Sequence, residues 1–301
     1  MRRGVAVGVA VASSTSTRSV LARAGSGGNS RGNLSVLSPH NSRSGGYVTA
    51  GRLDAVRESL SDRDWAIIRD VASLRLTTGK QLERLYFAGL VDASRPVVRR
   101  RVLGRLVRLR VLATLERRIG GVRAGSDGNV YYLDVAGQRL CDMARRGDVP
   151  GERYVRHILA LTEVYVSLTE RARAGRFRLD RFEAEPASWW PDGQGRRMKP
   201  DGYIRVSGAD HFDSWWLEVD LATEHLPTLK RKLGSYVDFW RHGQLGPDKI
   251  MPWVLVTVPS EKRCSEIDRL IRQLHPQDAE LFTVVLHNDA ADSIVRRLSQ
   301  P

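Results

Sequence analysis

Residues 199–224 constrain the fold more than any other part of this 301-residue chain. Their sequence, KPDGYIRVSGADHFDSWWLEVDLATE, predicts two strands at residues 202–206 and 214–222, separated by a polar turn. Side chains alternate between the two faces of a strand, so the second strand presents its acidic residues on one face and its leucines and valine on the other. The segment therefore predicts a pair of strands that brings several carboxylates together.

Three acidic residues lie at the ends of these expected strands. Asp201 opens the first strand, and Glu218 and Asp220 share one face of the second. Carboxylates at the ends of paired strands can converge on a hard cation, because Mg²⁺ prefers oxygen ligands in octahedral geometry and usually keeps several waters. We therefore expect Asp201, Glu218 and Asp220 to hold Mg²⁺, with Mn²⁺ as the alternative ion.

The order Pro200-Asp201, hairpin, Glu218-x-Asp220 resembles that of the PD-(D/E)xK nuclease superfamily. The resemblance implies that Asp201 and Glu218 hold Mg²⁺ while a lysine orients the attacking water or offsets charge. Hydrolysis of a phosphodiester needs such a metal, because the metal generates hydroxide and stabilises charge on the leaving oxygen. The chain departs from the pattern at one position, since Asp220 stands where the superfamily has its lysine.

Related nucleases sometimes supply the lysine from the next helix, which makes Lys232 the candidate here and Lys230 the second choice. The two lysines point in different helical directions, so both cannot face the site equally. Some superfamily members also use an outer ligand on the preceding helix, and Glu163 is the residue in that position. The candidate catalytic residues are therefore Asp201, Glu218, Asp220 and Lys232.

Two other interpretations of these residues stay open. In the first, Asp201 caps a turn, and neighbouring arginines satisfy Glu218 and Asp220 without any metal. The second concerns the tryptophan pairs at residues 189–190 and 215–216, which could stack on the bases of a single strand. Strand alternation instead predicts that one tryptophan of each pair is buried by packing, and we prefer this interpretation.

The net charge of +14 is concentrated in the first half of the chain. Residues 1–50 hold six arginines and no acidic residue, and residues 60–146 hold 18 basic against 9 acidic residues. This distribution predicts a polyanion-binding module attached to a near-neutral domain. Residues 1–50 are also rich in Ser, Gly and Asn without a periodic apolar pattern, so they predict a disordered basic tail.

Residues 60–146 predict three helices followed by a β-hairpin. The helices cover about residues 61–74, 79–87 and 94–109, and the hairpin pairs residues 111–119 with 130–133. This order is that of a winged helix-turn-helix, whose third helix enters the major groove while the hairpin approaches the DNA backbone. The candidate DNA-binding residues are Arg95, Arg99, Arg101, Arg105, Arg108, Arg117 and Arg118. The alternative is a solvated basic helix in a protein–protein adaptor.

Residues 147–151 contain two glycines and a proline and predict a linker, after which residues 152–290 predict a second domain. Its expected order is helix, three strands, helix, strand, helix, strand. The last two strands are almost continuous apolar runs, as expected for strands covered on both faces. The predicted fold class is α/β (α+β overall), with a winged helix-turn-helix followed by a PD-(D/E)xK-like mixed-sheet domain.

The cysteines and the apolar runs of the sequence indicate the expected cellular compartment. Cys141 and Cys264 lie far apart, so they predict neither a disulfide framework nor a metal cluster, and the cytoplasm is the expected compartment. No apolar run reaches the ~18–20 residues of a membrane span, so we expect no membrane partner. Residues 2–12 imitate a short secretory signal, but their apolar run is rich in Gly and Ala. A start codon upstream of the true one would explain this segment as well.

A narrower resemblance follows from the order of these motifs. A winged helix followed by PDG, LEVDLATE and the pattern KLxxY at residues 232–236 resembles the replication-relaxation family. The resemblance covers about residues 60–290. This family is found on plasmids and integrated elements of Gram-positive bacteria, especially actinobacteria, so the resemblance implies a role in plasmid replication or transfer. An Arg-rich, Lys-poor composition agrees with a high-GC actinobacterial source.

These patterns together predict a DNA-binding protein of a plasmid or integrated mobile element. We expect metal-dependent nicking of double-stranded DNA, with replication or transfer proteins as further partners. The alternative is a non-catalytic DNA-binding regulator or replication accessory whose second domain is a degenerate nuclease. The source of the catalytic lysine distinguishes these two functions. Asp220 at the superfamily's lysine position favours the non-catalytic accessory, whereas Lys232 on the next helix favours the nicking enzyme.

Overall fold

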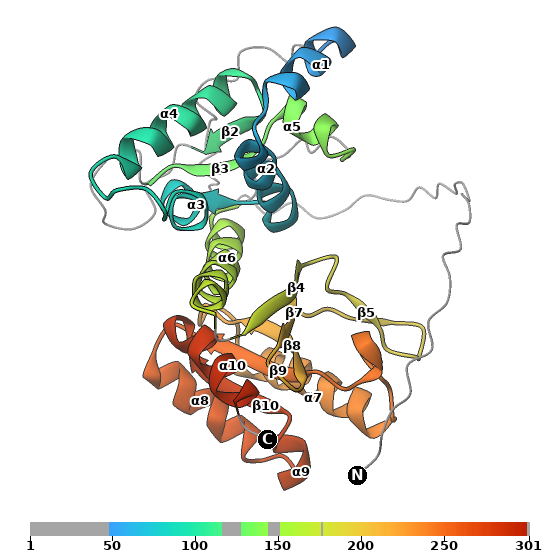
Figure 1. Cartoon of the computed structure of the whole chain (residues 1–301). Coiled ribbons are helices and arrows are strands. Elements are labelled where there is room, and N and C mark those ends of the chain that lie inside the picture. Colours follow the sequence, from blue (N-terminus) through green and yellow to red (C-terminus); the bar gives the residue numbers. More distant parts are fainter. Residues whose placement is uncertain (1–47, 116–127, 144–150, 176, 300–301) are drawn as a thin grey trace, which may run out of the picture. The chain divides into compact units, whose positions relative to one another are not determined.

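The computed structural model describes residues 48–115, 128–143, 151–175 and 177–299 (Figure 1). Helices and a mixed sheet alternate along the chain, which confirms the predicted α/β class. The described residues belong to one compact unit. The tail predicted at residues 1–50 lies outside the described residues, except for residues 48–50.

We call residues 48–143 the N-terminal lobe. Its helices are α1 (Ala50–Ser59), α2 (Asp62–Leu74), α3 (Gly79–Tyr86), α4 (Arg95–Arg108) and α5 (Val135–Leu140). Its strands are β1 (Thr77–Thr78), β2 (Leu112–Leu115) and β3 (Val130–Leu133), which form an antiparallel sheet in the order β1-β3-β2. The three predicted helices are α2, α3 and α4, and the predicted hairpin is β2–β3. Helix α1 was not predicted.

Two capping boxes define the starts of α2 and α3. The Asp64 carboxylate accepts a hydrogen bond from the Ser61 N–H at 2.8 Å, and the Ser61 hydroxyl accepts one from the Asp64 N–H in return. Thr78 and Gln81 make the same reciprocal pair at the start of α3. Each box satisfies backbone N–H groups that a first helical turn leaves without partners. The core behind these helices includes the fully buried Ile67, Ile68, Leu82, Leu103, Leu106 and Leu112.

We call residues 151–299 the C-terminal lobe. Its helices are α6 (Glu152–Arg173), α7 (Leu226–Arg241), α8 (Glu261–Ile271), α9 (Pro276–Ala279) and α10 (Ala290–Leu298). Its main strands are β4 (Arg178–Ala184), β7 (Gly202–Ser207), β8 (Phe212–Val219), β9 (Trp253–Val258) and β10 (Phe282–Leu286). A small hairpin of β5 (Trp190–Pro191) and β6 (Arg197–Met198) lies outside this sheet.

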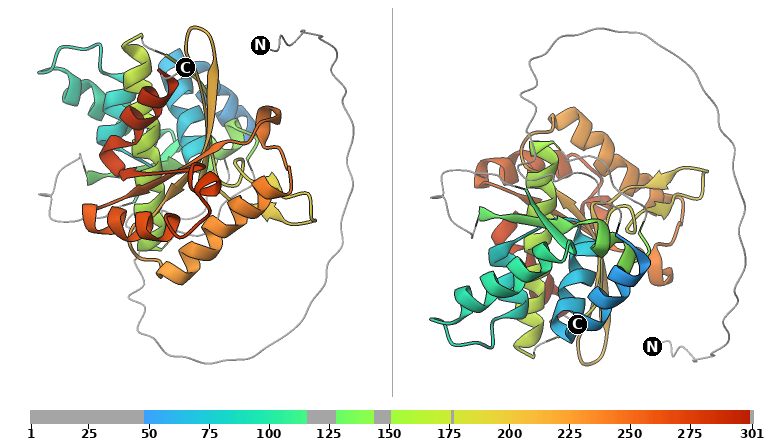
Figure 2. Two further views of the ribbon diagram at one scale, coloured as in Figure 1. Left: turned by 90° about the horizontal axis from the view of Figure 1, so that it is seen from below. Right: turned by 90° about the horizontal axis from the view of Figure 1, so that it is seen from above.

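The main sheet is mixed and runs in the order β10-β9-β8-β7-β4. Strands β4, β7 and β8 pair antiparallel, whereas β8, β9 and β10 pair parallel. Side chains of α6 and α10 pack on one face, and side chains of α7 and α8 pack on the other. Figure 2 shows these helices from two further directions. Strand β8 is therefore central in the sheet and covered on both sides.

The environment of β8 confirms one prediction and corrects another. Leu217 and Val219 join the core under α6, while Glu218 faces α7, as alternation predicts. Trp215 and Trp216 are both fully buried, so the prediction that only one of them is buried is wrong. The reason is the second layer of helices, because a strand covered on both faces buries odd and even positions alike.

Candidate active site and basic helix

A pocket of about 460 Å³ opens beside the start of α6, the end of β8 and the first turns of α7. Its lining includes Asp201, Glu218, Asp220, His157 and Lys232. The fold thus brings the predicted site residues into one pocket, namely Asp201, Glu218, Asp220 and Lys232. His157 is a member that the sequence analysis did not single out.

The hairpin positions Asp201 through its backbone and its side chain. The Asp201 N–H donates to the carbonyl of Leu217 at 2.9 Å, which ties the start of β7 to β8. One carboxylate oxygen of Asp201 accepts a hydrogen bond from the Val219 N–H at 2.7 Å. The second oxygen, Oδ1, lies 3.4 Å from Nε2 of His157 and 3.6 Å from Nζ of Lys232. Oδ1 therefore points at the cationic side of the pocket.

Lys232 lies between two carboxylates. Its ammonium group forms an ion pair with Oε2 of Glu218 as well as approaching Asp201. The other oxygen of Glu218 accepts a hydrogen bond from the hydroxyl of Tyr236, which lies one helical turn beyond Lys232 on α7. Lys230 instead donates to Gln273 at 3.4 Å on the surface, because it faces another side of the helix.

Burial and charge give the site residues unequal acidities. Burial raises the pKa of Glu218 to about 7, and the nearby Lys232 ammonium offsets this only in part. Burial would also raise the pKa of Asp201, but a hydrogen bond from His157 and the charge of Lys232 hold that pKa below its usual value. The pKa of Lys232 is raised despite its burial, because both carboxylates favour the ammonium form. Glu218 is thus the carboxyl that titrates near neutral pH.

Asp220 has a different partner. Its Oδ2 accepts a hydrogen bond from Nε of Arg263 at 2.5 Å, and its Oδ1 accepts one from the Ala222 N–H at 2.8 Å. The Asp220 and Arg263 side chains are 4% and 7% exposed, so this is a buried ion pair. We expected the carboxylates of Asp201, Glu218 and Asp220 to converge. In the structure the first two lie beside Lys232, whereas Asp220 pairs with Arg263. The interpretation that an arginine satisfies Asp220 agrees with this contact.

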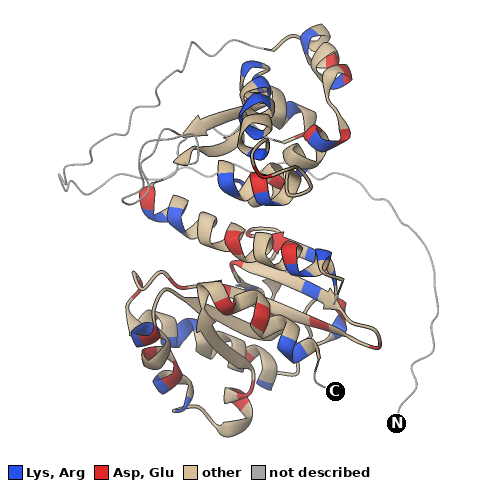
Figure 3. Ribbon diagram, turned by 60° about the vertical axis from the view of Figure 1, so that its left-hand side comes forward, with Lys and Arg blue, Asp and Glu red and all other residues tan. Residues whose placement is uncertain are grey.

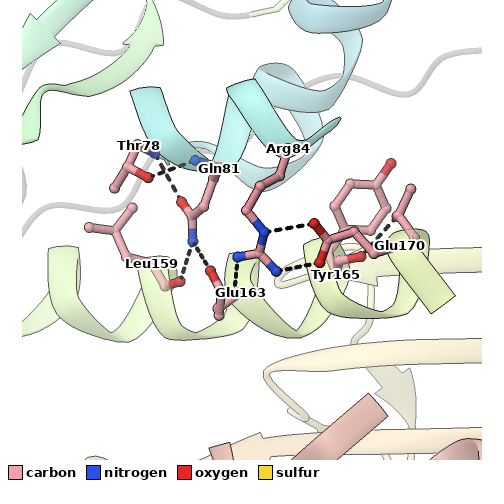
Figure 4. A network of polar contacts seen from close by, with 8 residues as sticks. Thr78, Gln81, Arg84, Leu159, Glu163, Tyr165 and Glu170 are labelled. Carbon is pink, nitrogen blue, oxygen red and sulfur yellow. Dashed lines mark hydrogen bonds and ion pairs between the residues drawn. The ribbon is translucent and has the colours of Figure 1, made fainter. Parts of the chain in front are cut away.

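Glu163, the predicted outer ligand, contacts side chains of α3 (Figure 4). Its oxygens contact Arg84 and the side-chain amide of Gln81, which donates at 3.0 Å. Arg84 also binds Glu170 about two turns further along α6, with hydrogen bonds of 2.8 and 2.5 Å. These contacts join α6 to α3 of the N-terminal lobe. Glu163 therefore has a structural partner rather than a place beside Asp201.

No group of three or more His, Cys, Asp or Glu side chains in the described part of the chain is placed to hold a metal ion. Two carboxylates nevertheless fit Mg²⁺, which proteins commonly bind through one or two carboxylates together with substrate phosphates. The Lys232 ammonium occupies the space between Asp201 and Glu218, so that space already accommodates a cation.

Tyr236 and His157 are the site residues that the sequence analysis missed. The KLxxY pattern contains a signal for Tyr236, because residues four apart on a helix share one face and Lys232 was already a candidate. His157 gives no such signal. It approaches Asp201 only because α6 packs along the sheet, and the two residues are far apart in the sequence.

Three of the arginines predicted to contact DNA instead have partners within the N-terminal lobe. Arg99 is 2% exposed and pairs with Glu83 at 2.9 Å. Arg105 pairs with the buried Asp64. Arg95 donates to two backbone carbonyls of the preceding loop at 3.1 Å. These contacts hold α4 against its neighbours. Arg99 needs its partner because it is buried, whereas Arg95 and Arg105 remain partly exposed.

Other arginines of α4 remain on the surface. Arg101 and Arg108, both predicted DNA contacts, are exposed, and so is Arg100. Figure 3 shows how basic and acidic residues are distributed over the ribbon. Arg117 and Arg118, predicted in the hairpin, lie outside the described residues. The exposed basic surface of α4 is thus narrower than the sequence suggested.

Within the described residues, no helix is both long and apolar enough to cross a membrane. No curated protein and no solved structure matches this chain. The family model for replication-relaxation matches residues 68–254, from within α2 to the start of β9. The matched segment contains α4, both site carboxylates and Lys232. Because it covers more than half of the 301 residues, this chain belongs to the replication-relaxation family.

Proposed function

We propose that this protein binds duplex DNA through its N-terminal lobe and nicks a strand in a Mg²⁺-dependent reaction at the pocket of the C-terminal lobe. Membership of the replication-relaxation family indicates a role in the replication or relaxation of mobile elements. Replication or transfer proteins are the partners that such a role implies. The proposal adds the two activities through which the protein would act.

The observation that carries the nicking proposal is the position of Lys232 between Asp201 and Glu218. Two carboxylates and a lysine from the next helix are the set that the resemblance to PD-(D/E)xK nucleases implies. In this assignment Asp201 and Glu218 hold Mg²⁺. When bound, the ion supplies a water of lowered pKa and stabilises charge on the leaving oxygen.

The chain's own residues have separate roles in this reaction. Lys232 carries a positive charge that would bind a non-bridging oxygen of the scissile phosphate, if Asp201 and Glu218 held the Mg²⁺ ion. Tyr236 holds one oxygen of Glu218 and leaves the other directed into the pocket. His157 contacts Asp201 and keeps its Oδ1 on the same side. Asp220 has no role in metal binding here, because Arg263 neutralises it.

The N-terminal lobe supports the duplex-binding proposal by its order of elements. Three helices, α2 to α4, precede the β2–β3 hairpin, and β1 joins that hairpin in one sheet. A winged helix-turn-helix has this order, and it presents its third helix to the major groove. Here the third helix is α4, whose surface carries three exposed arginines. Such charges contact phosphates and make binding sensitive to salt.

One observation favours a second candidate function, a DNA-binding accessory with a degenerate nuclease domain. The Lys232 ammonium already contacts both carboxylates, and an aspartate stands at the superfamily's lysine position. A pocket satisfied in this way needs no metal to be stable. The two candidates differ in whether a divalent cation displaces the ammonium.

A plasmid-nicking assay separates them. We expect the full chain to convert supercoiled plasmid to the open-circular form with Mg²⁺ or Mn²⁺ and not with EDTA. Lys232→Ala and Asp201→Asn should each slow nicking by about a hundredfold or more, by analogy with the loss of one transition-state contact in other enzymes. Lys230→Ala is the matched control, because this lysine lies on the same helix but outside the pocket.

Calorimetric titration with Mg²⁺ and Mn²⁺ completes the experiment. If the wild-type chain neither nicks plasmid nor binds either ion more tightly than Asp201→Asn, the nuclease proposal is wrong. The accessory function would then take its place, and duplex binding would still be expected.

A further inference from the structure

The outward side of α4 carries four residues in one line. They follow one another at intervals of four, three and four positions, which places them on a single stripe of a helix. We call Val97, Arg101, Gly104 and Arg108 the outer stripe of α4. Val97 is 56% exposed, and both arginines are exposed. The buried side chains of α4 face the opposite way.

Gly104 lies in the middle of this stripe, and the fold gives no reason for a glycine there. Its φ is not positive, and among the described residues a Cβ added to it would meet only a guanidinium nitrogen of Arg108, at 3.6 Å. Gly137 shows what a required glycine looks like, because a Cβ there would lie 2.2 Å from the carbonyl oxygen of Val111. Glycine in a helix interior is less favourable than alanine. Gly104 therefore weakens α4 without serving its packing.

We propose that the outer stripe of α4 is the surface that reads base edges in the major groove, and that Gly104 lets the helix backbone approach the bases closely. The inference rests on the duplex binding proposed above. A helix with its side chains is about 10–12 Å across, and the major groove is about 12 Å wide, so one missing side chain changes how deeply the helix can enter.

The neighbours of Gly104 fit base recognition. Arg101 and Arg108 lie about one turn to either side of it, and within the described residues neither makes an ion pair of the kind that holds Arg99 and Arg105. Arginine is the side chain most often found on guanine in the major groove, through O6 and N7. Val97 presents methyl groups of the kind that contact the thymine methyl. The stripe thus suits a site with guanines beside a thymine.

The test compares Gly104→Ala with Gly234→Ala in the full chain. Gly234 is the matched control, because it lies in the interior of another helix, α7, and an added Cβ meets nothing within 4 Å. The probe is a duplex pool with a randomised centre of about 20 base pairs. The wild-type chain first enriches a preferred duplex from this pool, and affinities are then measured for the enriched duplex and for the starting pool.

We expect the two variants to behave alike in stability and differently in binding. Each should raise Tm by about 2 °C, because alanine favours a helix interior. Gly104→Ala should weaken binding of the enriched duplex by about tenfold, since even one lost base contact costs this much. Its affinity for the starting pool should stay unchanged, because that binding depends on phosphate contacts. Gly234→Ala should change neither affinity.

The outcomes separate the inference from the proposed function. If Gly104→Ala keeps the wild-type affinity for the enriched duplex, the inference is overturned, although duplex binding by the lobe stands. Equal loss on both probes would also overturn it, because the glycine would then serve contacts to phosphates. If the wild-type chain binds no duplex at low salt, the proposed function itself fails.

Discussion

Glu218 is a buried carboxyl whose ionisation the fold opposes. Its pKa is about 7 in the folded chain, against 4.5 for an unperturbed glutamate, because the side chain is buried. Below about pH 4.5 the carboxyl is protonated in both the folded and the unfolded chain, so its burial as a neutral group carries no ionisation penalty and does not lower the free energy of unfolding. As pH rises through 7, the unfolded chain ionises readily while the folded chain must bury a charge, so stability is lost.

The size of this loss follows from the two pKa values. Each pKa unit of difference between them corresponds to about 1.4 kcal/mol. The free energy of unfolding should therefore fall by on the order of 3 kcal/mol between pH 4.5 and pH 8. Glu218→Gln removes the ionisation and retains an acceptor for Tyr236. The difference in free energy of unfolding between wild type and Glu218→Gln should therefore change by about 3 kcal/mol over this range, to the disadvantage of the wild type.

Urea unfolding in EDTA at pH 5, 6, 7 and 8 measures this difference. His157 is present in both chains, so its own titration largely cancels. Parallel stability curves for the two chains would refute the argument that Glu218 is buried with a raised pKa. Adding Mg²⁺ at pH 8 should stabilise the wild type and not Glu218→Gln, because the ion binds the ionised carboxylate of the folded chain.

Two further predictions concern charged side chains, one a buried ion pair and the other the exposed arginines of α4. Asp220→Asn should lower the free energy of unfolding by about 1–3 kcal/mol, because it removes the buried carboxylate partner of Arg263 and leaves only Glu266, 3.2 Å away, and thermal unfolding measures this loss. Replacing both Arg101 and Arg108 with alanine should weaken binding of the enriched duplex by about a hundredfold or more, because each arginine–guanine contact is worth about 1–3 kcal/mol, and fluorescence anisotropy measures this loss. An unchanged affinity in the folded double variant would place base recognition elsewhere on the molecule.

Local sequence patterns were sufficient to predict most helices and strands, and to predict that the carboxylates of Asp201 and Glu218 lie close together. Helix caps at Ser61 and Thr78 and the apolar run of β9 depend on residues that are neighbours in the sequence. Asp201 and Glu218 belong to one hairpin, so strand alternation and pairing bring them together without help from the rest of the chain. Helical direction implies that Lys230 and Lys232 cannot both face the site, but the packing of α7 decides that Lys232 is the one that does.

Tertiary structure alone decided which charged side chains are available for function. Arg263, which holds Asp220, lies 43 positions away in the sequence, and Arg84, which holds Glu163, lies 79 positions away. The sequence could not distinguish Arg99, buried on an ion pair, from the exposed Arg101, because both are arginines of one basic helix. The physical reason is that a charge removed from water must find an opposite charge, and the packing of distant elements determines which one lies within reach.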